Sequence, residues 1–166
     1  MKISIFGMGY VGVVSAACQA GDGHTVVGVD PNQSKVDLIN AGKNPIVEEG
    51  LGVLLATGVD TGLISATSDA AGAVAATDVS FICVGTPSLA NGGLDLTYVR
   101  RVCEEIGRAI GGKDSFHVVV ARSTMLPGSM LDIVIPTLEE YSGKIAGEDF
   151  GVCSNPEFLR EGTAIH

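Results

Sequence analysis

The segment GMGYVG, residues 7–12, constrains the fold of this chain more than any other feature. A short apolar run, ISIF, precedes it and a run of small apolar residues follows it, so the glycines lie at a turn from a strand into a helix. Gly7 permits the tight turn, Gly9 lets the backbone approach a pyrophosphate, and Gly12 lets the helix pack closely on the strand. Unpaired N–H groups at the start of the helix favour the phosphate charge. The motif predicts a dinucleotide-binding strand–helix–strand unit.

Asp30 ends the next apolar run, TVVGVD, and follows Gly12 by eighteen residues. Its carboxylate can accept hydrogen bonds from ribose hydroxyls and would repel a 2'-phosphate, which predicts NAD rather than NADP as the cofactor. The alternative is an aspartate that caps a helix beginning near Pro31. Lys35 lies one helical turn further on, where it either reaches the same ribose or is a solvated helix lysine.

Apolar runs alternate with helix-like stretches along the chain, as in a parallel sheet that helices cover on both faces. Helices are expected over residues 10–20, over 95–110 with Asp95 as the cap, and over 129–141 with a kink at Pro136. The sequence therefore predicts an α/β fold: a Rossmann-type, doubly wound, mainly parallel sheet with strand order 3-2-1-4-5-6. The strands are expected at residues 3–6, 25–29, 79–84, 117–121 and 150–153, with a weaker one at 64–67.

Composition narrows the class of partner. A chain of 166 residues, 46% of them hydrophobic, suits one domain. The net charge of −9 argues against a nucleic acid or a membrane surface as partner, because both are anionic. No apolar stretch is long enough to span a membrane, and the glycine spacing near the N-terminus argues against an export signal, so a cytoplasmic protein is expected. The four cysteines, which lack metal-ligand spacing, are expected to be reduced core thiols, and no metal site is expected.

Polar residues follow three of the later strands. Thr86-Pro87 closes ICVGTPS and Ser123-Thr124 closes VVVARST, and hydroxyls at the carboxyl ends of parallel strands are expected to face the cofactor. Each pair also suits a plain turn or cap. After the last strand, NPEFLREG carries Glu157, Arg160 and Glu161. These residues are either acid–base or substrate groups at a cleft or an exposed helix start.

Taken together, the segments resemble a known family. GMGYVG, GHTVVGVD, GKNPIVEEGL, FICVGTPS, RSTMLPG and NPEFLREGTAI occur in the order found in the UDP-glucose/GDP-mannose dehydrogenase family, across the whole chain. The segments CVGTPSLANGGLDL and VVVARSTMLPG are most similar to the members that oxidise GDP-mannose, which supply the mannuronate of bacterial alginate. The resemblance implies a two-step oxidation of a sugar-nucleotide C6 alcohol to a carboxylate, with two NAD+ and a cysteine thioester.

The resemblance also implies roles for individual residues. Glu157 and Thr124 are the catalytic candidates, with Glu157 managing protons or the hydrolytic water, and Glu161 would lie at the substrate and the nicotinamide. The residues implied to contact NAD, besides the motif glycines Gly7, Gly9 and Gly12, are Tyr10, Val11, Asp30, Lys35, Thr86 and Thr124.

Two departures from the family pattern affect the expectations. Glu49 stands where the family often has proline, and nothing matches the glycine-rich motif of the nucleophilic cysteine. Residues 1–166 are therefore expected to form the NAD-binding domain, the N-terminal part of a longer, homo-oligomeric enzyme whose central and sugar-nucleotide domains are absent. Such a chain is expected to bind NAD without turning over sugar nucleotide.

Two alternatives remain at this point. One is the same domain of a family member that oxidises UDP-glucose. The other is a regulatory nucleotide-sensing Rossmann domain, which would share the glycines and Asp30 but has no evident need for Thr86-Pro87, Ser123-Thr124 or NPEFLREG.

Overall fold

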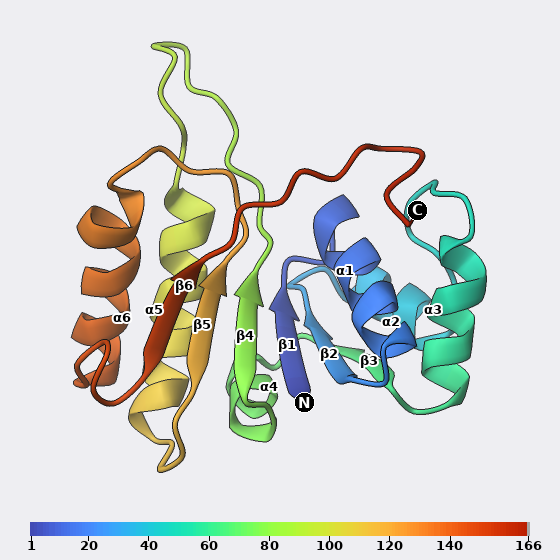
Figure 1. The fold of residues 1–166 in the computed structure, drawn as a ribbon, viewed down its shortest axis with the longest axis horizontal. Helices are drawn as coiled ribbons and strands as arrows, with labels where there is room; N and C mark the ends of the chain where they lie inside the picture. Colours follow the sequence, from blue (N-terminus) through green and yellow to red (C-terminus); the bar gives the residue numbers. More distant parts are fainter. Residues whose placement is uncertain (166) are drawn as a thin grey trace.

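Six parallel strands form a single sheet in the order β3-β2-β1-β4-β5-β6 in the computed structural model, which describes residues 1–165 (Figure 1). The order matches the one expected from the sequence. Because the order reverses between β1 and β4, the carboxyl ends of these two strands flank the crevice in which such sheets bind ligands. The strands are β1 (Lys2–Phe6), β2 (Thr25–Val29), β3 (Ile64–Thr67), β4 (Val79–Ile82), β5 (Val118–Ala121) and β6 (Gly151–Ser154).

The helices pack on both faces of the sheet (Figure 1). Three of them were not delimited by the sequence pattern. The sequence of α4 is AAGAVAA, which has no polar face to reveal a helical period, although Asp69 caps it by accepting a hydrogen bond from the Gly72 amide. The helices are α1 (Tyr10–Gly21), α2 (Gln33–Asn40), α3 (Leu51–Asp60), α4 (Ala70–Ala76), α5 (Thr97–Gly111), the π-helical turn η1 (Met130–Val134) and α6 (Ile135–Ser142).

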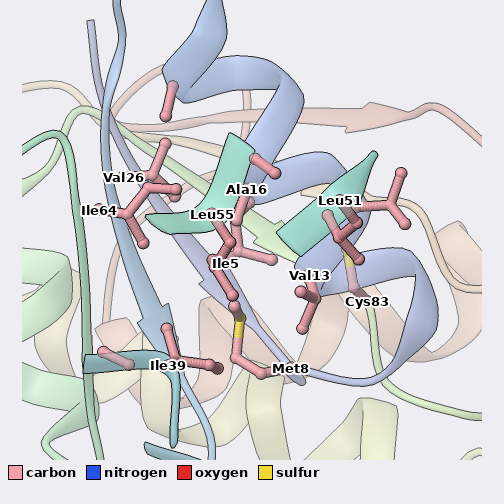
Figure 2. Packing of buried hydrophobic residues seen from close by; sticks show 14 of the residues in the cluster. Ile5, Met8, Val13, Ala16, Val26, Ile39, Leu51, Leu55, Ile64 and Cys83 are labelled. Atoms are coloured by element: carbon pink, nitrogen blue, oxygen red, sulfur yellow. The ribbon is translucent and has the colours of Figure 1, made fainter. Parts of the chain in front are cut away.

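Two apolar layers hold the helices against the sheet. Alternation along β1 sends Ile5 into the layer beneath α1 and α3, and sends Phe6 into the layer beneath α4, α5 and α6. In the first layer, Ala16 and other small residues of α1 let this helix approach the strands closely. Leu51 and Leu55 of α3 pack in the same layer (Figure 2). The tight fit of α1 brings its first turn to the carboxyl end of β1.

The segment expected to be one helix over 129–141 is a π-helical turn followed by an α-helix. Pro136 lies in the first turn of α6, directly after η1. Proline lacks an N–H group and its ring clashes with the carbonyl four residues earlier, so the wider π turn accommodates it at this point.

The start of α5 also differs from the expectation. Asp95 accepts a hydrogen bond from the Thr97 amide at 2.9 Å, but the first helical residue is Thr97, so Asp95 forms the turn that leads into the helix. The predicted apolar face is confirmed, since Val99, Cys103 and Ile106 are fully buried.

A chain of buried polar groups lies near the amino ends of the central strands. His117 is fully buried, and its Nε2 atom lies 2.8 Å from Ser80 Oγ, which in turn lies 2.7 Å from Ser4 Oγ. Lys113 Nζ lies 3.0 Å from His117 Nδ1 and also donates to the carbonyls of Val74 and Thr77. Because an ammonium group only donates, Nδ1 is the acceptor and Nε2 carries the proton.

After β6 the chain crosses over the carboxyl edge of the sheet toward α1 and α3 (Figure 1). Leu159, Ala164 and Ile165 pack against the first apolar layer. The crossing places the NPEFLREG segment over the edge where the glycine turn lies. None of the helices described within residues 1–165 is long and apolar enough to cross a membrane.

Candidate functional site

The glycines of GMGYVG have three different environments. Gly7 has φ +93°, and a Cβ atom there would lie 2.9 Å from Cγ1 of Val84. A Cβ atom on Gly12 would collide with the carbonyl oxygen of Gly7, so α1 can approach the turn only with glycine at this position. A Cβ atom on Gly9 would meet nothing within 4 Å. The turn and packing roles expected of Gly7 and Gly12 therefore match the geometry, and Gly9 faces open space.

The start of α1 presents an uncompensated positive end to that open space. Gly9 is the N-cap residue, no side chain caps the helix, and its first turn contains no acidic residue. The first backbone N–H groups of the helix, at Tyr10 and Val11, have no carbonyl partner within the helix. A twelve-residue helix with such an N-terminus suits an anionic ligand such as a pyrophosphate.

Two cavities meet at the glycine turn. The first cavity, of about 460 Å³, extends from Gly9 toward Asp30, Lys35 and α5, and the second, of about 280 Å³, extends from Gly9 toward the ends of β4 and β5. Gly9, Cys83, Val84 and Gly85 line both, so the cavities are two halves of one cleft at the carboxyl ends of β1 and β4. A cleft divided at a helix N-terminus suits a dinucleotide with its pyrophosphate at the division.

Asp30 lies at the wall of the first cavity and is only 5% exposed. Its carboxylate accepts hydrogen bonds from the Met8 amide at 2.9 Å, the Asn32 amide at 3.0 Å and Lys35 Nζ at 2.7 Å. Asn32, not Asp30, caps α2, because its side chain accepts from the Lys35 amide. A carboxylate has about four acceptor positions, so this one keeps capacity for a ligand hydroxyl. Lys35 is ion-paired and lines the cavity, which argues against a purely solvated lysine.

Met8 links the position of Asp30 to the core. Its side chain is fully buried and lies over Gly28 of β2, where an added Cβ atom would approach Met8 Sδ to 2.7 Å. The amide of the same residue donates to Asp30. The absence of a side chain at Gly28 therefore makes room for the residue that holds the carboxylate in place.

The polar strand ends meet at the second cavity. Thr86 Oγ1 donates to the carbonyl oxygen of Thr124 at 2.7 Å and so joins the loops that follow β4 and β5. Both residues line the second cavity, together with Tyr10 and Val11. Ser123 lines this cavity too, but its hydroxyl donates to the Val84 carbonyl at 2.7 Å. Burial of Ser123 at the strand end explains this role, since a buried hydroxyl needs a partner.

Arg122 also lines the second cavity, and the sequence interpretation missed it. Its Nη1 atom donates to Asn155 Oδ1 at 2.8 Å, and its guanidinium carbon lies 5.9 Å from the centre of the Phe81 ring. Within residues 1–165 its Nε atom is buried without a hydrogen-bond partner. The available signal was a cation directly before the Ser-Thr pair at a strand end. The first cavity has similar unpredicted neighbours on α5, among them Tyr98, Arg101 and Glu105.

The carboxylates of NPEFLREG occupy different positions. Glu157 lines the second cavity, and its Oε2 atom accepts from the Leu159 amide at 2.6 Å. Glu161 is exposed. Partial burial of Tyr10, then its hydrogen bond to Glu48, and least the negative charge of Glu161 raise the pKa of Tyr10 to about 12, although the Gly162 backbone acts in the opposite direction. Tyr10 is therefore a hydrogen-bond donor and not an acid at neutral pH.

The cysteines do not have the environment of a nucleophile. Burial raises the pKa of Cys83 and of Cys103 to about 12, and burial also raises the pKa of Cys18. Cys153 is exposed, so the expectation of four core thiols is wrong for this residue. The reason is that β6 is the edge strand of the sheet. Among residues 1–165, no group of three or more histidines, cysteines and acids could hold a metal ion.

Relatives of known function match the chain over almost its whole length. GDP-mannose 6-dehydrogenase of Azotobacter vinelandii is 59% identical over 165 residues, which are 99% of this chain and 38% of that protein. UDP-glucose 6-dehydrogenase of Rhizobium meliloti is 45% identical over 99% of this chain and 36% of that protein. A crystal structure of a ternary complex of GDP-mannose dehydrogenase from Pseudomonas aeruginosa superposes with a TM-score of 0.98, at 60% identity, over 99% of this chain and 38% of that one.

The chain thus spans less than two fifths of the length of these relatives. Residues 1–166 match the family model described as the UDP-glucose/GDP-mannose dehydrogenase family, NAD binding domain. The strand order, the glycine turn and the divided cleft agree with that description. On these grounds the chain belongs to the UDP-glucose/GDP-mannose dehydrogenase family, as its NAD-binding domain.

Proposed function

We propose that this chain is the cofactor-binding part of an NAD-dependent GDP-mannose 6-dehydrogenase, which oxidises a sugar-nucleotide C6 alcohol to a carboxylate. The observation that carries the proposal is the cleft divided at Gly9, with a buried carboxylate at one end and hydroxyl and carboxylate groups at the other. Identity to the GDP-mannose 6-dehydrogenases exceeds identity to the UDP-glucose enzymes, which favours GDP-mannose as the substrate.

In this proposal the first cavity holds the adenosine half of NAD. The spare acceptor capacity of Asp30 takes a hydrogen bond from a ribose hydroxyl, and Lys35 holds the carboxylate in place. A 2'-phosphate would add negative charge next to Asp30, so NADP is disfavoured. The pyrophosphate lies over Gly9 at the N–H groups of Tyr10 and Val11.

The second cavity holds the nicotinamide half. NAD+ supplies a hydride acceptor when bound. Thr86 and Thr124, joined by their hydrogen bond, orient this half, and Glu157 lies where its carboxylate can accept a proton from the substrate or activate a water. Glu161 contacts the sugar nucleotide. Cys83, although it lines the cavity, stays a neutral thiol at neutral pH and takes no covalent role.

The thioester step implied by the family resemblance then needs a cysteine other than these four. Cys18, Cys83 and Cys103 have raised pKa values, and Cys153 lies on the edge strand β6. We therefore expect residues 1–166 to bind NAD without oxidising GDP-mannose. We expect the enzyme to which this domain belongs to reduce two NAD+ for each sugar nucleotide that it oxidises.

Calorimetry with NAD+ and NADP+ tests the cofactor part of the proposal. We expect residues 1–166 to release heat with NAD+ and to bind NADP+ at least about tenfold more weakly, a difference of about 1.4 kcal/mol. No heat at millimolar NAD+, or equal affinity for both dinucleotides, would contradict it.

Assays of NADH formation test the substrate part. The protein expressed from its complete gene is expected to oxidise GDP-mannose in preference to UDP-glucose, while residues 1–166 alone produce no steady NADH with either. A preference for UDP-glucose would replace the proposed substrate with the one named for the relative from Rhizobium meliloti. Steady turnover by residues 1–166 would refute the assignment of the nucleophile to another cysteine.

A further inference from the structure

Glu48 is a buried carboxylate that no sequence motif assigned to the site. Its side chain is 7% exposed and lies just before α3. Its Oε2 atom accepts hydrogen bonds from the Tyr10 hydroxyl at 2.6 Å and the Gly162 amide at 2.7 Å, and its Oε1 atom accepts from the Ala164 amide at 2.9 Å. One carboxylate therefore joins three segments that are far apart in the sequence.

The hydrogen bonds make this burial favourable. A buried carboxylate costs free energy unless donors satisfy it, and hydrogen bonds to a charged acceptor are stronger than neutral ones. The donors at Glu48 come from the first residue of α1 and from the crossing segment, residues 155–165, which runs over the carboxyl edge of the sheet. Leu159 and Ala164 of the crossing segment also pack on the same apolar layer as Tyr10.

Both joined segments belong to the proposed NAD site. Tyr10 lines the second cavity, and its hydroxyl donates to Glu48. The ring and the backbone of Tyr10 are therefore the groups that can contact a ligand. The crossing segment carries Glu157, which lines the same cavity, and Glu161. A ligand that fixes Tyr10 also fixes one of the donors that Glu48 has within residues 1–165.

We propose that Glu48 is a positioning residue that couples occupation of the second cavity to the placement of residues 157–164, an inference that rests on the proposed NAD site. Bound dinucleotide restrains Tyr10, Tyr10 restrains the Glu48 carboxylate, and the carboxylate then holds the amides of Gly162 and Ala164 with less loss of entropy. By linkage, ordering of this segment tightens dinucleotide binding by the same factor. Glu48 thereby sets the carboxylates of the segment over the cleft when the cofactor is present.

A purely structural role for Glu48 makes a different prediction. In that case its hydrogen bonds would stabilise the crossing segment equally with and without dinucleotide. The distinguishing quantity is the effect of NAD+ on the crossing segment. Hydrogen exchange at the Gly162 and Ala164 amides reports this effect directly, and tryptic cleavage after the exposed Arg160 reports it independently.

The variants are Glu48→Gln, Tyr10→Phe and the control Glu49→Gln. Glu49 is adjacent and exposed, so the control makes the same change of charge away from the buried network. Tyr10→Phe keeps both amide hydrogen bonds to Glu48 and removes only the link to α1. It therefore keeps the proposal testable even if Glu48→Gln fails to fold.

In the unsubstituted chain and in Glu49→Gln, saturating NAD+ is expected to slow both exchange and cleavage about tenfold, the effect of one charged hydrogen bond. In Glu48→Gln, exchange and cleavage are each expected to be faster without ligand. In Glu48→Gln and in Tyr10→Phe, saturating NAD+ is expected to slow exchange and cleavage by less than about twofold. Equal protection by NAD+ in Tyr10→Phe and the unsubstituted chain would overturn the coupling. So would heat of NAD+ binding without protection in the unsubstituted chain. Absence of binding heat there would overturn the NAD site and, with it, the coupling.

Discussion

The Nζ atom of Lys35 lies 2.7 Å from Oδ2 of Asp30, at the wall of the first cavity. The carboxylate is buried and the lysine is about one third exposed, so water screens this pair only in part. Two backbone amides complete the donors to Asp30. The carboxylate is thereby fixed in one orientation before any ligand arrives, which lowers the entropic cost of binding.

The first prediction concerns Asp30→Asn. Loss of the charge removes a charge-assisted hydrogen bond to the ribose and the repulsion of a 2'-phosphate, so NAD+ affinity is expected to fall about 10- to 100-fold while the preference over NADP+ narrows. Calorimetry with both dinucleotides measures this. Asp37→Asn, an exposed change on α2, the helix that carries Lys35, serves as control and should leave both affinities within about twofold. Unchanged NAD+ affinity in Asp30→Asn would contradict the assignment of Asp30.

The second prediction separates two glycines of the same motif. Gly9→Ala places its methyl group in open space at an extended backbone, so the melting temperature should hardly change while NAD+ affinity falls at least about tenfold. Gly12→Ala drives its methyl group against the Gly7 carbonyl and is expected to lower the free energy of unfolding by about 1–3 kcal/mol. Urea unfolding and calorimetry on both variants test this. If Gly9→Ala lost stability and kept its affinity, the proposed place of the pyrophosphate would be wrong.

The third prediction concerns pH and His117. Burial and then the positive charge of Lys113 lower the pKa of His117 from 6.5 to about 4, although the Thr77 backbone and Asp78 act in the opposite direction. Between these two values the unfolded chain binds a proton that the folded chain does not, so the stability present above pH 6.5 is lost as the pH falls toward 4. The loss attributable to this group is on the order of 2–3 kcal/mol.

Urea unfolding at a series of pH values measures this loss. Subtracting the curve of His117→Gln from that of the unsubstituted chain isolates the contribution of the histidine. His24→Gln is the matched control, because His24 is partly exposed and contacts the N-terminal amino group. A difference curve that is flat between pH 4 and 6.5 would show that His117 titrates normally.

The fourth prediction concerns thiol reactivity. Cys153 is exposed, whereas Cys83 and Cys103 are buried with pKa values raised to about 12 and Cys18 is partly buried with a raised pKa. Since the thiolate is the reactive form, one thiol per chain should react rapidly with an aromatic disulfide reagent. Cys153→Ser should abolish the rapid phase. A rapid phase that persists in this variant would mean that a buried cysteine is accessible.

Much of the fold was predictable because the strands that form it are short, apolar and regularly spaced. The alternation of strands and helices was predicted from apolar runs such as TVVGV and from the apolar helix face of Val99, Cys103 and Ile106. The helix α4 escaped detection because its residues are nearly all alanine and glycine, and the π turn before Pro136 depends on crowding in the chain that no periodicity reports. The edge position of β6 likewise decided the exposure of Cys153.

The site was predictable to the extent that backbone geometry defines it. Gly7, Gly12 and Asp30 belong to a fixed spacing between a strand, a turn and the next strand, so the motif located them. Arg122 and Glu48 have no such spacing. Their roles arise from contacts between segments that are more than thirty residues apart, Arg122 with Asn155 and Glu48 with Tyr10 and Gly162. Contacts of that kind require the three-dimensional structure.

The packing of Met8 over Gly28 has a consequence for how such a domain can change during evolution. The amide of Met8 holds Asp30, while its side chain fills the space that Gly28 leaves in the core. A methyl group at Gly28 would push Met8 aside and shift its amide away from the carboxylate. Dinucleotide preference can therefore change through a substitution inside the hydrophobic core, at a residue that lines neither of the two cavities.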